Sequence, residues 1–363
     1  MGGVSMEWKE DVLGNVLEVK YGKDHKKLAD GQYPVYGSGG LMRYVDSKLY
    51  DGPSILIPRK GTLNNIMFVE SPFWTVDTMF WSIINTDKVD PKFLFYSICK
   101  RDFASMNVGS AVPSMTVNIL NDIQISYPKN IEDQRRIASI LSSLDRKIEL
   151  NNKINADLEE MAQAIFKNWF VDFEPFKDGK FVDSELGMIP EGWKVGCLGV
   201  IAEITSGKRP PKKSKDKTKE LFIPLIGASD IMGFTSDVLY ERPILVIGRV
   251  GTHGVVQRFQ EKCWPSDNTL VIESSYYNYV YQLLKGIDYS AINRGSTQPL
   301  ITQTDVKNTD VIIAPENVLK EYESITSTLF SKHRANIKEN SRLSTLRDTL
   351  LPRLMSGELE VPE

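Results

Sequence analysis

Positive charge is concentrated in one short stretch of the sequence, residues 207–219. Seven Lys or Arg residues stand there against a single acid, Asp216, over 13 positions. Cations at this density suit the phosphates of a nucleic acid, which bind Lys and Arg with release of counterions. A loop that only solubilises the chain is the alternative. The candidate phosphate contacts are Lys208, Arg209, Lys212 and Lys213.

The first half of the chain has a basic segment in the equivalent place, Gly22-Lys-Asp-His-Lys-Lys27. Its cations are Lys23, Lys26 and Lys27. A basic loop at the same position in both halves favours phosphate binding over solubility alone. We therefore expect two nucleic-acid-facing loops, one in each half.

Two turns of the form Arg-x-Gly-Thr carry a second kind of candidate. A guanidinium and a hydroxyl on a glycine turn suit base edges or phosphates, although a tight turn by itself also explains the glycine. These candidates are Arg59, Lys60, Thr62, Arg249, Thr252 and His253. Charge and repeat position add Arg43, Arg294 and Gln298 to the expected DNA contacts.

The sequence contains no recognisable catalytic constellation. It lacks the Gly-x-x-x-x-Gly-Lys-Ser/Thr phosphate loop, the Gly-x-Ser-x-Gly nucleophile turn and the Asn-Pro-Pro-Tyr signature of amino-methyltransferases. Its three cysteines and three histidines are widely separated, so no chelating pair predicts a metal site. We predict no catalytic residue, no bound metal and no cofactor for this chain itself.

Length and composition indicate a multidomain globular protein. A chain of 363 residues exceeds one ordinary domain, and 41% hydrophobic with 25% charged residues is the globular average. No apolar run reaches the roughly 20 residues that cross a bilayer, and the N-terminus lacks a signal-peptide core, so we expect a cytoplasmic protein without membrane contact. The net charge of −3 means that any basic surface must be local.

The chain contains an internal two-fold repeat with a period near 187 residues. Trp8, Leu13 and Gly22 recur as Trp193, Leu198 and Gly207, at an offset of 185. The turn at residues 57–62 recurs at residues 247–252, at an offset of 190, and residues 109–113 recur at 295–299, at an offset of 186. Such drift is typical of insertions and deletions in loops, so the repeat predicts two copies of one domain.

Each half ends in a long helical pattern with heptad spacing. The first seam contains Ile137, Leu141, Leu144, Ile148, Leu158, Ile165 and Trp169, with Asn151 and Asn155 at its centre. The second contains Ile325, Leu329, Leu343, Leu346 and Leu350, and its centre is more polar. A helix of about 40 residues is about 60 Å long, which indicates a spacer. Polar centres in both seams predict that the helices pair and fix their register.

The segments around these helices read as mixed α/β, or α+β, domains. Short β-rich runs at residues 54–57, 79–84, 244–247 and 269–272 are separated by Gly, Pro and Asp. We expect a first globular domain at residues 1–129 and a first spacer helix at 130–172. A connector and second globular domain then occupy residues 173–316, followed by a second spacer helix and tail at 317–363.

Three strings resemble one known family, the specificity subunits of type I restriction-modification enzymes. They are Ala164-Ile-Phe-Lys-Asn-Trp-Phe-Val-Asp-Phe-Glu-Pro175, Gly187-Met-Ile-Pro-Glu-Gly-Trp193 and Leu350-Leu-Pro-Arg-Leu-Met-Ser-Gly-Glu-Leu359. The resemblance spans nearly the whole chain. It implies two target recognition domains that each read one half of a split sequence in double-stranded DNA, held apart by two long helices packed as an antiparallel coiled coil.

The resemblance also implies that the chain recognises DNA without catalysing a reaction. Two modification subunits carrying adenosylmethionine would methylate adenine, and restriction subunits would add translocation and cleavage driven by ATP with magnesium. Two alternatives stay open. In the first, the chain is the specificity module of a stand-alone modification system. In the second, it is a nucleic-acid enzyme with an unrecognised site.

Overall fold

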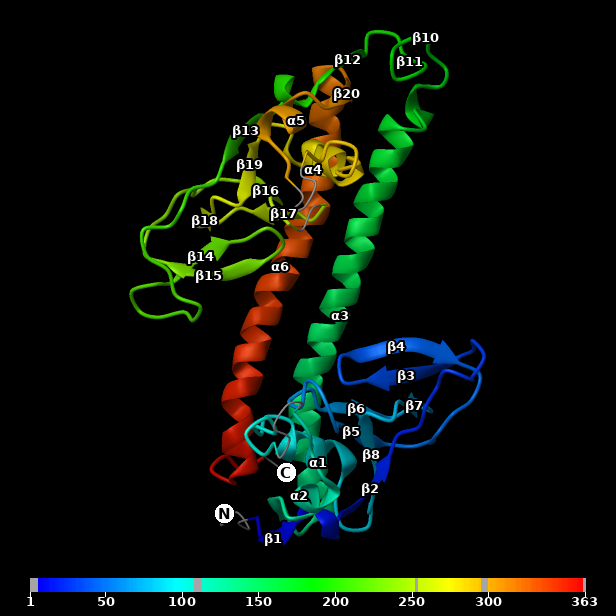
Figure 1. The fold of residues 1–363 in the computed structure, drawn as a ribbon, viewed down its shortest axis with the longest axis vertical. Helices are drawn as coiled ribbons and strands as arrows, with labels where there is room; N and C mark the ends of the chain where they lie inside the picture. The colour runs from blue at the N-terminus through cyan, green and yellow to red at the C-terminus, as the bar shows by residue number, and fades with distance from the viewer. Residues whose placement is uncertain (1–5, 108–112, 252–253, 295–299, 362–363) are drawn as a thin grey trace. The chain divides into compact units, whose positions relative to one another are not determined.

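A computed structural model describes residues 6–107, 113–251, 254–294 and 300–361 (Figure 1). The chain forms two compact units. Unit 1 combines the residues up to Asn152 with those from Ile337 onwards, and unit 2 comprises residues 153–336. Both long helices, α3 (Ile131–Phe170) and α6 (Glu316–Met355), therefore contribute one part to each unit. None of the helices in the described ranges combines the length and the apolar character needed to cross a membrane.

Unit 1 begins with a domain of short strands and two short helices. A four-stranded antiparallel sheet has the order β2-β8-β5-β6, a three-stranded sheet has the order β4-β3-β7, and β1 pairs with β9. Its elements are β1 (Trp8–Val12), η1 (Leu13–Asn15), β2 (Leu17–Tyr21), β3 (Tyr33–Gly37), β4 (Gly40–Val45), β5 (Ser54–Pro58), β6 (Met67–Val69), β7 (Trp74–Thr75), β8 (Met79–Ile84), α1 (Pro91–Ile98), α2 (Val117–Asn121) and β9 (Gln124–Pro128).

Unit 2 repeats this topology from β12 to β20 and adds η2 and an antiparallel β10–β11 pair ahead of it. Its sheets have the orders β13-β19-β16-β17 and β15-β14-β18, and β12 pairs with β20. The elements are η2 (Glu174–Phe176), β10 (Phe181–Val182), β11 (Ile189–Pro190), β12 (Lys194–Cys197), η3 (Leu198–Val200), β13 (Glu203–Ser206), β14 (Ile223–Ile226), β15 (Ile231–Thr235), β16 (Ile244–Gly248), β17 (Val256–Phe259), β18 (Trp264–Pro265), β19 (Thr269–Glu273), α4 (Tyr277–Gly286), α5 (Gln303–Lys307) and β20 (Asp310–Ile313). The predicted duplicated mixed α/β fold is confirmed.

The central strands explain why these sequences fold as sheets. Strands β5 and β16 are buried along their whole length, and both are runs of β-branched and aliphatic residues. Each forms the interior of its four-stranded sheet, next to β8 in unit 1 and β19 in unit 2. The four β-rich runs found in the sequence correspond to these four strands.

Each long helix ends with a reversal against a tryptophan. At the end of α6, Gly357 has a φ of +73°, and its Cα lies so close to Trp8 that a Cβ would be 2.7 Å from the indole Nε1. At the end of α3, Phe173 has a φ of +53°, and its ring packs edge-on against Trp193 at 5.5 Å. The left-handed residue lets the chain turn back onto the core of the same unit.

The two helices run antiparallel within unit 1. Arg347 Nη1 donates to Asp145 Oδ1 at 2.6 Å, and Asn151 Nδ2 donates to Asn340 Oδ1 at 2.8 Å, so the numbering rises on one helix as it falls on the other. In unit 2, Asn336 pairs with Asn155 in the same sense. The polar centre of the seam thus consists of paired side chains, as the sequence predicted.

The predicted seam is correct for α3 and partly wrong for α6. Ile137 and Leu141 are buried, and the other predicted positions that lie at least partly inside are Leu144, Ile148, Leu158, Ile165, Trp169, Leu329, Leu343 and Leu350. Ile325 and Leu346, however, are 39% and 46% exposed. Their neighbours Thr326 and Arg347 face inward instead. This is possible because the buried Thr326 Oγ1 donates to the Tyr322 carbonyl and the partly buried Arg347 pairs with Asp145, so both polar groups have partners.

A caged arginine ties the second domain to its helices within unit 2. The guanidinium of Arg258, on β17, lies 3.4 Å from the ring centroid of Phe330 on α6 and 4.7 Å from that of Tyr281 on α4. Its Nη2 also donates to Asn278 Oδ1 at 2.7 Å. Cation–π contacts of this kind gain strength when they are shielded from water.

Candidate nucleic-acid interface

The basic loop of unit 1 starts at a tightly packed glycine. A Cβ on Gly22 would lie 2.0 Å from the carbonyl oxygen of Val76, so only glycine fits between the two segments. The next residue, Lys23, donates from its backbone N to the Thr75 carbonyl at 2.9 Å and accepts from Trp74 Nε1 at 2.9 Å. This arrangement fixes the backbone of Lys23 and leaves its side chain exposed.

The loop of unit 2 starts in the same way. A Cβ on Gly207 would lie 2.1 Å from the Ser266 carbonyl oxygen. Lys208 donates to the Pro265 carbonyl at 3.0 Å, and its own carbonyl accepts from Trp264 Nε1 at 2.7 Å. The Gly-Lys and Trp positions of the sequence repeat are therefore one structural device, present twice, that anchors the first residue of each basic loop.

The predicted phosphate contacts on both loops are solvent-exposed. They are Lys23, Lys26 and Lys27 in unit 1, and Lys208, Arg209, Lys212 and Lys213 in unit 2. In unit 2 the loop is held a second time, because Ser214 and Phe234 exchange two backbone hydrogen bonds of 2.9 and 2.8 Å. A loop anchored at two points can hold several cations toward a phosphate backbone.

The two Arg-x-Gly-Thr turns also have matching geometry. Arg59 donates from its backbone N to the Thr78 carbonyl and accepts from the Met115 N, and Arg249 makes the same two contacts with Asn268 and Ile301. The turn glycines Gly61 and Gly251 have φ values of +87° and +80°, which is the left-handed region that favours glycine.

The arginine side chains differ between the two turns. The guanidinium of Arg59 lies 5.3 Å from the ring centroid of Tyr21. The Nε of Arg249 is buried, and it meets no hydrogen-bond acceptor among the described residues. Lys60 and Thr62 are exposed beside Arg59. Both turns thus place a guanidinium next to a glycine turn at equivalent positions of the two domains.

Two of the predicted DNA contacts, Arg43 and Arg294, also have partners within the protein. Arg43 Nη2 donates to the Leu28 carbonyl at 3.0 Å and to Asp30 Oδ1 at 2.9 Å, which holds the basic loop of unit 1 against β4. Arg294 forms an ion pair with Asp305, the third residue of α5, whose carboxylate completes the capping box with Thr302. Thr252, His253 and Gln298 lie outside the described residues.

Charge alone missed a pair of exposed methionines. Met42 on β4 is 56% exposed, and Met232 on β15 is 49% exposed. The two are 190 residues apart, the same offset as the Arg-x-Gly-Thr turns. The sequence repeat therefore aligns the two methionines, whereas a search for charged residues does not find them.

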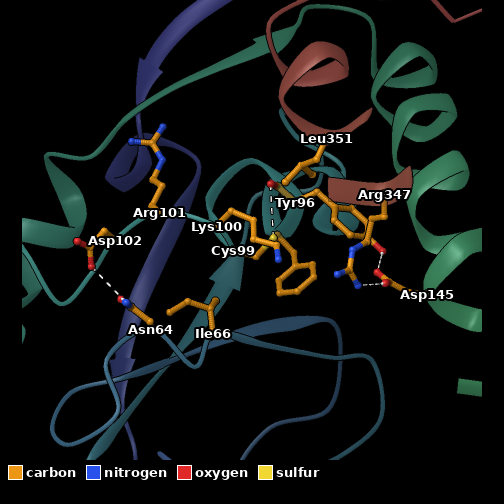
Figure 2. A pocket seen from close by; sticks show the side chains of 11 residues that line it. Asn64, Ile66, Tyr96, Cys99, Lys100, Arg101, Asp102, Asp145, Arg347 and Leu351 are labelled. Carbon is orange, nitrogen blue, oxygen red and sulfur yellow. Dashed lines mark hydrogen bonds and ion pairs between the residues drawn. The ribbon is translucent and has the colours of Figure 1, made fainter. Parts of the chain in front are cut away.

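Unit 1 also contains a pocket of about 410 Å3 at the end of α1 (Figure 2). Asp145 accepts hydrogen bonds there from Tyr96 Oη at 2.5 Å and from Arg347 Nη1 at 2.6 Å. Burial raises the pKa of the Cys99 thiol in the pocket wall to about 11. The thiol is therefore protonated at neutral pH, and the carboxylate is already paired within the protein.

Metal-binding groups are not clustered in the part of the chain that the structure describes, where no three His, Cys, Asp or Glu side chains could share an ion. All three cysteines are free thiols, and Cys263 is fully buried. Burial raises the pKa of Cys263 to about 12.

Fold and site together define a duplicated recognition protein, with two copies of one domain that each carry an anchored basic loop and an arginine turn. The sequence matches the type I restriction modification DNA specificity domain over residues 6–160 and again over residues 190–342. The matches cover most of the chain, so the chain belongs to this family.

Two known relatives extend along nearly the full length. The type I restriction enzyme MjaIX specificity subunit of Methanocaldococcus jannaschii is 31% identical, over 93% of this chain and 86% of the relative. The HindI specificity subunit of Haemophilus influenzae is 24% identical, over 81% and 83% of the two chains. The crystal structure of a type I restriction-modification S subunit from M. genitalium has the same fold, with a TM-score of 0.67 over 97% of each chain at 16% identity.

Proposed function

We propose that this chain reads a two-part DNA sequence, with one recognition domain for each part. The observation that carries the proposal is the duplication of the whole interface. Both domains have the glycine that admits the loop, the tryptophan that anchors it and the arginine turn. Two equivalent readers on one chain suit two half-sites on one duplex.

The chemistry in this proposal belongs to partner subunits. The chain supplies recognition, and two modification subunits carrying adenosylmethionine methylate the bound sequence. Restriction subunits add cleavage that requires ATP and magnesium. Support comes from family membership and from relatives named as specificity subunits of type I restriction enzymes.

The partner should also complete the DNA-binding surface. The net charge of the chain is −3, so a broad phosphate footprint needs basic surface beyond that of the two loops. We expect the isolated chain to bind DNA weakly and to gain sequence specificity when the modification subunit is bound.

The test compares the chain alone with the chain plus its modification subunit. Methylome sequencing of cells that express both identifies the target, and binding is then measured on that duplex and on a scrambled duplex at fixed salt. The proposal predicts one split target and discrimination in the complex only. A complex that methylates no defined sequence contradicts the proposed function, and full specific affinity in the isolated chain contradicts the role given to the partner.

A further inference from the structure

Both recognition domains contain the same irregularity in the same hairpin. In the β3–β4 pair, Val35 faces Arg43 and Tyr36 faces Leu41, so Met42 is the extra residue of a β-bulge. In the β14–β15 pair, Leu225 faces Gly233 and Ile226 faces Ile231, so Met232 is the extra residue. A bulge bends its strand and redirects a side chain out of the regular alternation.

A glycine lies against each methionine: Gly37 is the last residue of the facing strand β3, and Gly227 directly follows the facing strand β14. A Cβ on Gly37 would lie 2.6 Å from Met42 Sδ, and a Cβ on Gly227 would lie 3.3 Å from Met232 Cβ. Each methionine thus rests on a glycine surface and still remains about half exposed. The preceding residues, Leu41 and Ile231, are 52% and 45% exposed.

Single exposed apolar residues are common on protein surfaces and need no explanation. Here the bulge, the supporting glycine and an exposed apolar pair occur together, and they occur twice at one offset. Packing alone gives no reason for both domains to keep a flexible apolar side chain at a redirected position. The repetition therefore indicates a shared contact rather than chance exposure.

The surroundings of each methionine identify the chemistry of that contact. In unit 2 the basic loop crosses β15 directly beside Met232, because Ser214, between Lys213 and Lys215, pairs with Phe234 and its carbonyl oxygen closes over Gly233. In unit 1 the basic loop is held to β4 through the contact of Arg43 with Leu28 and that of Asp46 with Ala29.

The hairpin of unit 1 also adjoins the arginine turn. Asn65 Nδ2 donates to the Ser38 carbonyl at the hairpin turn, and the side chain of Ser38 lies next to Gly61. Each exposed methionine is thus an apolar side chain with cations beside it. This combination fits a DNA groove, where phosphates flank the base edges and the thymine methyl group accepts apolar contact.

We propose that Met42 and Met232 are specificity-determining residues, each of which contacts a thymine methyl group in one half-site. The inference rests on the proposed function and adds residues that charge does not reveal. The basic loops position the phosphates, and the methionines contribute part of the sequence discrimination. One methionine serves each domain, so each acts on a different half-site.

The experiment uses the complete complex with the modification subunit on its own target duplex. Met42→Ala and Met232→Ala are compared with Met188→Ala, whose side chain is 55% exposed in the connector. Each base pair of the target is replaced in turn, including thymine by uracil, which removes only the methyl group. Since one buried methyl group contributes about 0.8 kcal/mol, wild type should lose about fourfold in affinity at one thymine in each half-site.

Met232→Ala should abolish the uracil effect in one half-site, Met42→Ala should abolish it in the other, and Met188→Ala should behave as wild type. If an alanine variant unfolds at a lower temperature than wild type, Met42→Gln and Met232→Gln, which keep the side-chain length, provide the same comparison. A wild-type complex indifferent to every thymine methyl, or methionine variants that retain every wild-type preference, overturns the inference while the proposed function stands. A wild-type complex without any sequence preference overturns the proposed function itself.

Discussion

Asn336 donates a hydrogen bond from its Nδ2 to Oδ1 of Asn155 across 2.9 Å. Both residues are buried, with 1% of the surface of Asn336 and 8% of that of Asn155 exposed. A buried amide pair is satisfied only when the two helices are in one register. A purely apolar seam would tolerate a shift of one helix along the other. The pair therefore specifies how α3 and α6 align within unit 2.

Asn155→Ala should destabilise the protein, because it leaves the Asn336 amide buried without its acceptor. The expected loss is about 1–3 kcal/mol in the free energy of unfolding, measured by urea denaturation. Asn152→Ala is the matched control, since Asn152 accepts from Asn340 in an exposed pair. The control should change stability by less than about 0.5 kcal/mol. Equal effects of the two substitutions would show that the buried pair has no special role.

Gly357→Ala should cost more than an ordinary glycine substitution. The φ of +73° strains any L-residue, and the new Cβ would meet Trp8 Nε1 at 2.7 Å. Gly187 has a φ of +93° with no described atom within 4 Å of its Cβ position, so Gly187→Ala measures backbone strain alone. We expect about 1 kcal/mol for Gly187→Ala and about 2–3 kcal/mol for Gly357→Ala by thermal unfolding. Equal losses would exclude a contribution from the Trp8 contact.

Periodicity and self-comparison predicted the architecture well, because burial imposes regular patterns on a sequence. The strands β5, β8, β16 and β19 are apolar runs, and both long helices follow heptads. The seam of α6 was misplaced at Ile325 and Leu346 because an apolar neighbour looks like the better core residue. Sequence does not show that Thr326 and Arg347 find partners inside.

The site was less predictable for a related reason. Charge identifies which residues can meet phosphate but not which of them also have partners within the protein, as Arg43 and Arg294 do. The methionine bulges depend on strand register, which is a property of two segments facing each other. The repeat offset was the one signal in the sequence that would have linked Met42 with Met232.

Glu323→Gln should stabilise the protein at neutral pH. Burial raises the pKa of Glu323, while the backbone N–H of Tyr279, which donates to its carboxylate at 2.8 Å, opposes that shift. A carboxyl whose folded pKa is raised binds more protons in the folded state, so wild-type stability falls as pH rises above the ordinary value of 4.5.

The comparison is made by urea unfolding of both proteins from pH 4 to pH 8. Below the ordinary pKa, Glu323 is protonated in both states and the advantage of glutamine should disappear. Its advantage should grow with pH and level off above the raised pKa. A constant difference across the range would mean that the carboxylate is not penalised by its surroundings.

Removing the cations of the second basic loop should weaken binding to all DNA sequences alike. Lys208, Arg209, Lys212 and Lys213 are exposed, and we expect them to contact phosphates rather than bases. In the complete complex, replacing all four by Ala should lower affinity and flatten the plot of log affinity against log salt, with a loss of up to about 0.9 in slope for each phosphate contact removed. The control replaces four exposed lysines elsewhere, Lys88, Lys129, Lys177 and Lys320. An unchanged slope in the loop variant would show that the loop does not contact phosphates and only solubilises the chain.

Arg249 is expected to read one half-site, and Arg59 the other, because the two occupy equivalent turns in separate domains. The buried Nε of Arg249 meets no acceptor among the described residues. A bidentate guanidinium contact to guanine contributes about 1–3 kcal/mol of discrimination. Arg249→Ala should therefore relax recognition at one position in one half-site when the complex methylates a library of randomised targets. Arg249→Lys should relax it as well, because lysine keeps the charge but lacks the planar fork.

Arg242→Ala is the matched control for these variants. Arg242 stacks on Tyr240 at 5.3 Å and pairs with Glu273 on the surface of the same domain, so the control removes a paired arginine outside the proposed interface and should leave the library profile unchanged. Arg59→Ala should relax the half-site that Arg249→Ala leaves intact. If both half-sites relax together in either variant, or if Arg249→Lys retains full discrimination, then the arginine turns support the fold or the phosphate contacts, and the bases are read elsewhere.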